Sequence, residues 1–198
     1  MQQWIPYTLF TLAITFSPGP INLLVMAMAG QAGWRATLPA VFAACITAAL
    51  TIVLAGIGAA SLLVKAPLVP TVLSWIGVIW LTYMAWGLAT SDPTISASGT
   101  GQAVTLNGPK AAGLQLINPK GWMMALTAVT VFAGSDATPA TIVSMALVFL
   151  AFALLGTSAW ALMGTGSRKW LTTPRRMKLF NLSMAIALVG MAWWSVLS

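Results

Sequence analysis

The sequence contains no histidine, a single cysteine and only two acidic residues, Asp92 and Asp136. A zinc site requires several Cys, His or carboxylate ligands, and a Ser-His-Asp triad requires a histidine base. A dithiol redox centre requires a second sulfur beside Cys45, at least within one protomer. These absences exclude most catalytic and metal chemistry, so we expect neither an enzyme nor a protein that carries a metal or another cofactor.

Charged residues of either sign are also scarce. They make up 6% of the 198 residues, against roughly a quarter in soluble domains, whereas 59% are hydrophobic and the mean hydropathy is +0.92. Such a chain has more apolar surface than one core can bury and too few charges to solvate a globule. A soluble enzyme and a nucleic-acid-binding protein are therefore excluded, although the net charge is +7. The composition indicates an integral membrane protein whose outer surface contacts the lipid bilayer.

Six apolar stretches are long enough to cross a bilayer as helices, which takes roughly 20 residues each. They cover residues 4–28, 38–64, 69–89, 111–133, 139–163 and 179–197. The first is interpreted as a retained span, because no Lys or Arg precedes it and no small-residue cleavage site closes it. The polar connector 90–110, rich in Ser, Thr and Gly, separates a first three-helix repeat (1–89) from a second (111–198). If one stretch is re-entrant, the alternative is five spans with a cytoplasmic N-terminus.

The positions of the nine cations predict the orientation of the chain. With six spans, loops one, three and five lie on one side of the membrane, and loops two and four contain only Lys65. The first group of loops contains Arg35, Lys110, Arg168, Lys169, Arg175, Arg176 and Lys178. The positive-inside rule therefore places loops one, three and five in the cytoplasm and both termini in the periplasm. The remaining cation, Lys120, lies in no loop.

The first span is interrupted by the run Ser17-Pro18-Gly19-Pro20. A proline inside a helix removes a hydrogen bond and clashes with the preceding turn. Residues 4–16 give about 20 Å of helix at 1.5 Å per residue, which is too short for a hydrocarbon core of roughly 30 Å. The break must therefore lie within the membrane, and Asn22 follows it closely.

The fourth span is interrupted by Asn118-Pro119-Lys120-Gly121. Residues 121–134 give about 21 Å of helix, so this span is incomplete without residues 111–117. Lys120 is thus expected near the middle of the membrane, where a lysine costs about 2.5–3.5 kcal/mol to insert. A cost of that size favours a functional role. The alternative is that the span begins later and Lys120 snorkels to the cytoplasmic interface.

Both breaks are expected to restart a helix in the same way. Ser17 before Pro18, and Asn118 before Pro119, match the favoured pairing of an N-cap residue with proline at the first helical position. Each restart directs free backbone N–H groups and a partial positive charge at the break, which suits an anion. Each break also lies in the first span of a three-span group, and the two groups cross the membrane in opposite senses. Broken helices at matching places in inverted repeats are typical of transporters.

With its six spans, its Pro-Gly-Pro break and its Asn-Pro-Lys motif, the chain resembles the LysE/RhtB family of small amino-acid exporters over essentially its whole length. The family's first motif usually reads Pro-Gly-Pro-Asn, whereas here Ile21 intervenes before Asn22. Members often carry an acidic residue in the second span, where this sequence has none and Thr47 lies roughly in its place. The resemblance implies an all-α protein of the bacterial inner membrane. It also implies efflux of amino acids or their derivatives, driven by the proton gradient.

We therefore hypothesise alternating access around a substrate site between spans one and four. The expected site residues are Ser17, Pro18, Gly19, Pro20, Asn22, Asn118, Pro119, Lys120 and Gly121. Lys120 and the helix starts are expected to hold the substrate carboxylate, and the two asparagines to add hydrogen bonds. Carbonyls freed before the breaks, in 14–16 and 116–117, are expected to accept hydrogen bonds from the substrate ammonium. Because no intramembrane carboxylate is available to balance a second cation, a neutral zwitterionic amino acid is favoured.

A second interpretation is a membrane-embedded interaction or assembly protein that transports nothing. Ala40, Ala44 and Ala48, and also Gly56 and Ala60, form small-residue stripes. Such stripes pack helices closely, either within one chain or between the protomers of a homo-oligomer. Lys120 separates the two interpretations, because a pure scaffold has no reason to retain it.

Ten tryptophans are many for a chain of this length. Six lie near predicted span ends, where interfacial anchoring accounts for them. The deeper four are Trp75, Trp80, Trp122 and Trp160. Most of these are expected to be packing residues, and one or two to line a cavity.

Overall fold

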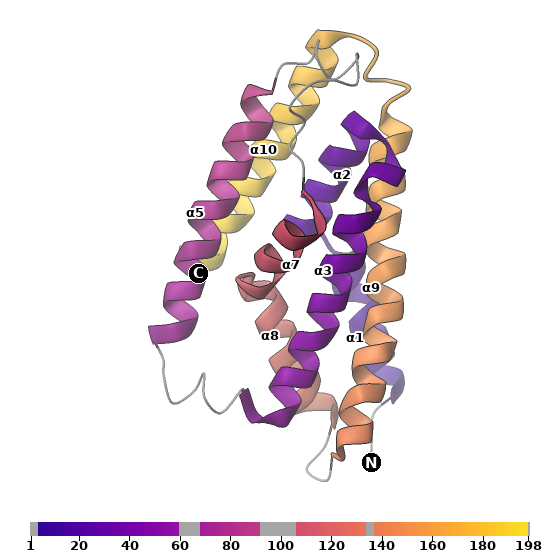
Figure 1. Cartoon of the computed structure of the whole chain (residues 1–198), viewed down its shortest axis with the longest axis vertical. Coiled ribbons are helices and arrows are strands. Elements are labelled where there is room, and N and C mark those ends of the chain that lie inside the picture. Colours follow the sequence, from indigo (N-terminus) through magenta and orange to yellow (C-terminus); the bar gives the residue numbers. More distant parts are fainter. Residues whose placement is uncertain (1–3, 60–67, 92–105, 134–136, 198) are drawn as a thin grey trace.

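The computed structural model describes residues 4–59, 68–91, 106–133 and 137–197 (Figure 1). In these ranges the chain is helical and has no β-strand. The helices are α1 (Trp4–Phe16), α2 (Pro20–Ala32), α3 (Trp34–Leu54), α5 (Leu68–Thr90), α7 (Gly108–Leu116), α8 (Pro119–Thr127), α9 (Pro139–Ser167) and α10 (Pro174–Leu197). α3 and α8 continue as the π-helical segments η1 (Ala55–Ala59) and η2 (Ala128–Ala133). The all-α prediction is thus confirmed for the described residues.

Three helical segments are long and apolar enough to cross a membrane, namely Trp34–Gly58, Pro139–Ser167 and Pro174–Trp194. The pair α1 and α2, bent by 47° at its break, makes a fourth if it is one span. Apolar helices of membrane-crossing length are therefore confirmed, whereas six spans in two inverted repeats stay a prediction. Residues 60–65, which include Lys65, and residues 92–105 of the connector lie outside the described residues.

The helices pack around α9, which contacts α1, α2 and α3. α7 and α8 also contact α3. α5 and α10 run side by side along one side of the molecule, and α10 joins this pair to α2 (Figure 1). The turn from α2 to α3 and the connection from α9 to α10 lie at the same end of the molecule, at the top of Figure 1. Both helix breaks lie between the α5–α10 pair and α9, with Gly19 and Asn118 buried and Pro18 exposed.

Several helix contacts are so close that only glycine fits. A Cβ atom added at Gly164 of α9 would overlap the carbonyl of Met26 in α2. One added at Gly156 would lie 2.8 Å from the Thr15 oxygen. Lipid tails give helices no hydrophobic reason to associate, so close packing of small residues has to hold them together. The glycines of α9 therefore fix the position of the first, broken span.

The alanine stripe of α3 is used within the chain. Ala40, Ala44 and Ala48 are all buried. α3 contacts α7 on one side and α9 on another. Gly108 of α7 lies in ordinary packing contact with α3, since a Cβ there would lie 3.4 Å from the Pro39 oxygen. Of the two uses that the sequence left open for this stripe, the structure shows packing inside one protomer.

The outer surface of the protein is apolar. On α5 the exposed side chains include those of Trp75, Ile79, Tyr83 and Trp86. Water would not solvate such a surface, but a hydrocarbon layer does. The large exposed apolar side chains therefore support the membrane location that the composition predicts.

The contact between α2 and α9 yields a stability prediction. We expect Gly164→Ala to lower the melting temperature of the detergent-purified protein by roughly 2–10 °C, because an overpacked contact costs about 1–3 kcal/mol. Gly166→Ala is the matched control, since no atom lies within 4 Å of a Cβ at Gly166 in the same helix. Equal melting temperatures for the two variants would contradict this account of the packing.

Candidate functional site

The first break is a short extended segment between α1 and α2. Gly19 is the N-cap of α2, with φ −165° and ψ 165°, and Pro20 occupies the first turn. Ser17 belongs to the end of α1, because its N–H donates to the Ala13 oxygen at 3.0 Å and its hydroxyl to the Ile14 oxygen at 2.7 Å. The expectation that Ser17 caps a helix beginning at Pro18 is therefore wrong. The Ser17 hydroxyl bonds to the Ile14 carbonyl and to Lys120 instead, and the helix begins at Pro20, two residues after the predicted start at Pro18.

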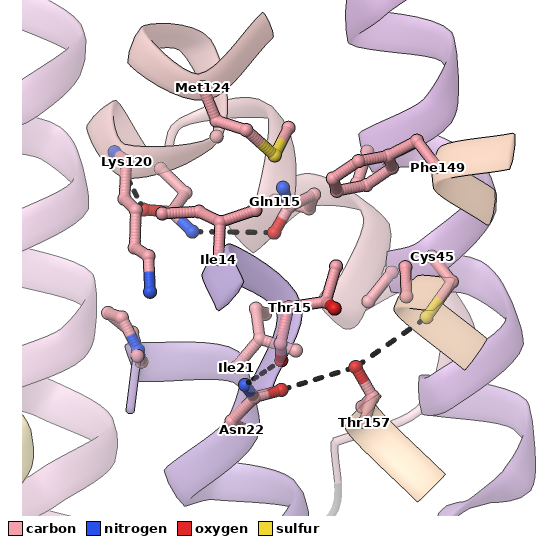
Figure 2. A pocket seen from close by; sticks show the side chains of 17 residues that line it. Ile14, Thr15, Ile21, Asn22, Cys45, Gln115, Lys120, Met124, Phe149 and Thr157 are labelled. Carbon is pink, nitrogen blue, oxygen red and sulfur yellow. Dashed lines mark hydrogen bonds between the residues drawn. The ribbon is translucent and has the colours of Figure 1, made fainter. Parts of the chain in front are cut away.

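The second break follows the prediction. Asn118 is the N-cap of α8, Pro119 lies in the first turn, and the Asn118 side-chain oxygen accepts from the Lys120 N–H at 3.1 Å. The Asn118 amide donates in turn to the Gln115 side-chain oxygen at 3.3 Å (Figure 2). The side chain of Asn118 is thus held on both sides and fixes the start of α8.

Lys120 joins the two breaks. Its ammonium donates to the Ser17 hydroxyl at 2.7 Å and to the Pro18 carbonyl at 3.0 Å. Gly19 makes room for this contact, because a Cβ there would lie 3.1 Å from the lysine nitrogen. An ammonium has three N–H donors, and these bonds to described residues use two of them. The half-buried charge is therefore stabilised by a hydroxyl and a carbonyl dipole, and the third donor is free to meet a ligand oxygen.

The backbone carbonyls freed at the breaks have partners inside the protein. The Thr15 oxygen accepts from the Asn22 amide at 3.0 Å, and the Phe16 oxygen from the Trp160 indole N–H at 3.2 Å. At the other break, the Leu116 oxygen accepts from the Trp122 indole at 2.7 Å.

These internal bonds bear on two expectations. The carbonyls at 15, 16 and 116, which were expected to accept from a substrate ammonium, each accept an internal hydrogen bond through one of two lone pairs, and their role toward a substrate stays a prediction. Trp122 and Trp160, expected mainly to pack, donate to the broken helices. Their depth in the spans, near the breaks, was the only sequence signal for this role.

A chain of buried polar side chains crosses three segments of the fold next to the first break (Figure 2). Cys45 of α3 donates to the Thr157 hydroxyl of α9 at 3.7 Å, and Thr157 donates to the Asn22 side-chain oxygen at 3.2 Å. The Asn22 amide also donates to the Ser17 carbonyl at 3.0 Å. Asn22 therefore positions the break from within. Sequence reasoning missed Thr157 and Gln115, which stand out only as polar residues in apolar spans.

Two cavities meet at the breaks. The smaller, of about 80 Å³, lies among Asn22, Gln115 and the Cys45–Thr157 pair. The larger, of about 400 Å³, lies between the breaks and the α5–α10 pair. Both are lined by Gly19, Pro20, Asn118 and Lys120.

The two cavities differ in what they can hold. The smaller has about half the volume of a roughly 150 Å³ cavity that accepts benzene, so it is too small for an amino acid with a side chain. The larger falls in the range of roughly 300–1,000 Å³ typical of small-molecule sites. The geometry therefore makes the larger cavity the candidate ligand site.

Eight of the nine predicted site residues line one or both cavities. Pro18 and Pro119 line the larger, Asn22 and Gly121 the smaller, and Gly19, Pro20, Asn118 and Lys120 both. Ser17 lines neither and enters the site through its bond to Lys120.

The second span contributes to the smaller cavity with one face of α3. Ala44, Cys45 and Ala48 line this cavity, whereas Thr47 does not. No acidic residue lines either cavity among the described residues.

Comparison with known proteins places this chain in a family. The model of LysE type translocators matches residues 12–197. A cysteine/O-acetylserine efflux protein of Klebsiella pneumoniae is 28% identical over 156 residues, which cover 78% of each chain. Proteins of the same name from Salmonella paratyphi A and Escherichia coli K12 are 28% and 27% identical, also with 78% of each chain covered. No solved structure matches the chain significantly.

The family and the names of these relatives describe transporters rather than enzymes, and they support amino-acid efflux. Exporters of this family are multi-pass proteins of the inner membrane, which the long apolar helices fit. Because the family model matches nearly the whole chain, this protein belongs to the LysE-type translocators.

Proposed function

We propose that the protein exports neutral amino acids or close derivatives from the cytoplasm by alternating access around the paired helix breaks. The observation that carries the proposal is the position of Lys120, whose ammonium holds the two breaks together at the edge of a 400 Å³ cavity. A lysine inside a membrane protein is costly and marks a functional site by default.

The carboxylate of the substrate binds at Lys120. The third N–H of the ammonium is available to it, and the starts of α8 and α2 add the partial positive charge of a helix N-terminus at the same place. When a carboxylate takes the bonds that Lys120 makes to Ser17 and Pro18, the two breaks are no longer tied together. Substrate binding thereby releases the contact that holds the site in this state.

A neutral substrate fits the charges around the site. Lys120 offers one full positive charge to a carboxylate, but no described residue offers a negative charge to a second ammonium. The relatives are named for the efflux of cysteine and O-acetylserine, both of which have uncharged side chains. Lysine and arginine would bring a second positive charge close to Lys120 without a counter-ion.

For the membrane topology we propose six spans in two inverted repeats, 1–89 and 111–198, joined by residues 90–110. Each repeat has the same order of elements, a broken helix followed by two long helices. Arg35 lies in the first turn of α3 and Arg168 at the C-terminal cap of α9, and the guanidinium of Arg168 lies 3.0 Å from a Cβ built at Gly33, between α2 and α3. The end of the molecule that carries both arginines is cytoplasmic by the positive-inside rule, and both termini are then periplasmic.

Replacing Lys120 tests the site directly and separates transport from a scaffold role. We expect Lys120→Met to lower amino-acid export at least tenfold while the amount of protein in the membrane stays unchanged, because Met keeps the length and removes the charge. Lys110→Met is the control, since Lys110 is exposed at the start of α7. Unchanged export by Lys120→Met would remove the proposed site and favour the assembly interpretation.

The substrate class is tested by growth on toxic amino acids and analogues. Cells that express the protein are expected to resist neutral analogues and to remain sensitive to analogues of lysine and arginine. The reason is the lack of a counter-ion for a second cation. Resistance to dibasic compounds alone, with no effect on neutral ones, would contradict the charge argument.

Coupling to the proton gradient is the third element of the proposal. Export from preloaded cells is expected to fall severalfold when an uncoupler collapses the gradient, measured against the passive leak of cells that carry the Lys120→Met variant. Export that continues at the same rate would indicate a uniporter.

A further inference from the structure

The larger cavity has a polar end and an apolar end. Lys120 and Asn118 lie with the helix breaks at the polar end. The other wall is formed by Leu81 of α5 and by a short stretch of α10, Gly190, Met191, Ala192 and Trp194. If the carboxylate of a zwitterion is held at Lys120, its side chain would contact this apolar wall.

Gly190 leaves part of this cavity open. A Cβ added there meets no atom within 4 Å, and the residue is exposed rather than packed against a neighbouring helix. Gly164, Gly156 and Gly77 are different, because in each case an added Cβ would run into a backbone carbonyl. Helix packing therefore does not require a glycine at position 190. The missing side chain instead leaves part of the cavity unfilled on the side opposite the breaks.

We propose that this apolar half of the cavity is the subsite for the substrate side chain, and that it selects neutral amino acids with large apolar side chains, of the size of leucine, methionine or phenylalanine. Gly190 sets the upper size limit. The inference rests on the proposed function, since it assumes that Lys120 holds the carboxylate of an exported amino acid.

Three features support this assignment. The cavity volume of about 400 Å³ exceeds what a small amino acid fills, so alanine leaves much of the apolar wall uncovered. The neighbouring 80 Å³ cavity has about half the volume of one that accepts benzene, so it is too small to take a side chain of the size of phenylalanine instead. Finally, a hydrophobic pocket discriminates between two substrates by roughly 10–200-fold for each methylene by which their side chains differ.

The test compares export of radiolabelled alanine, leucine and phenylalanine from preloaded cells by the wild type and by Gly190→Ala and Gly190→Leu. Both substituents are better helix formers than glycine, so α10 is expected to fold. The control is Gly166→Leu, an exposed glycine of α9 that also has no atom within 4 Å of an added Cβ and lies in neither cavity.

We expect the wild type to export leucine and phenylalanine at least tenfold faster than alanine. Gly190→Leu is expected to lower phenylalanine export at least tenfold and alanine export less than twofold, with Gly190→Ala in between and Gly166→Leu unchanged. Three results would overturn the subsite. The wild type could prefer alanine, Gly190→Leu could leave phenylalanine export unchanged, or Gly190→Leu could lower the export of all three substrates equally. If Lys120→Met still abolishes export in these cases, only the subsite is lost. If the wild type exports no amino acid, the proposed function itself fails.

Discussion

The structure depends on how backbone carbonyls are satisfied where a helix is broken inside a membrane. Hydrocarbon offers no hydrogen bonds, so each carbonyl freed by a proline must find a donor in the protein. At the first break the donors are Asn22, Trp160 and Lys120, and at the second the donor to Leu116 is Trp122. The breaks are tolerated because these side chains lie beside them, and two of the donors, Asn22 and Lys120, also line the cavities of the candidate site.

Some of these donors come from the other half of the chain. Lys120 belongs to α8 and Trp160 to α9, yet both bond to the break in the first span, at the end of α1. The two halves are therefore tied together at the breaks, and a movement that exposes the site to one side of the membrane has to exchange these bonds. Among the described residues, the α5–α10 pair is tied to the other helices by the packing of α10 on α2, by the contact of α5 with α8 and by the bond from Gln31 to Asn181. The larger cavity lies between this pair and the breaks.

The sequence was sufficient for the features that depend on local chemistry. Proline inside an apolar run predicts both breaks, and Asn118 before Pro119 predicts the cap of α8, because each signal lies within four residues. It was not sufficient where a residue's partner lies in another helix. The Ser17 hydroxyl is used by Lys120, about one hundred positions away, so the local cap rule chose the wrong residue. For the same reason the roles of Trp160, Thr157 and Gly190 became visible only in three dimensions.

The charge of Lys120 explains why the site is suited to an anion without being permanently filled by one. The two carboxylates of the chain, Asp92 and Asp136, belong to segments outside the described helices, so neither is part of the site that the structure describes. A resident carboxylate beside Lys120 would satisfy the ammonium and compete with any substrate. A hydroxyl and a carbonyl stabilise the ammonium of Lys120 less than a full negative charge does. A stronger acceptor, such as a carboxylate, can therefore replace them. The α3 residues at the site, Ala44, Cys45 and Ala48, carry no acid, which agrees with the proposal that the substrate carboxylate is the partner of Lys120.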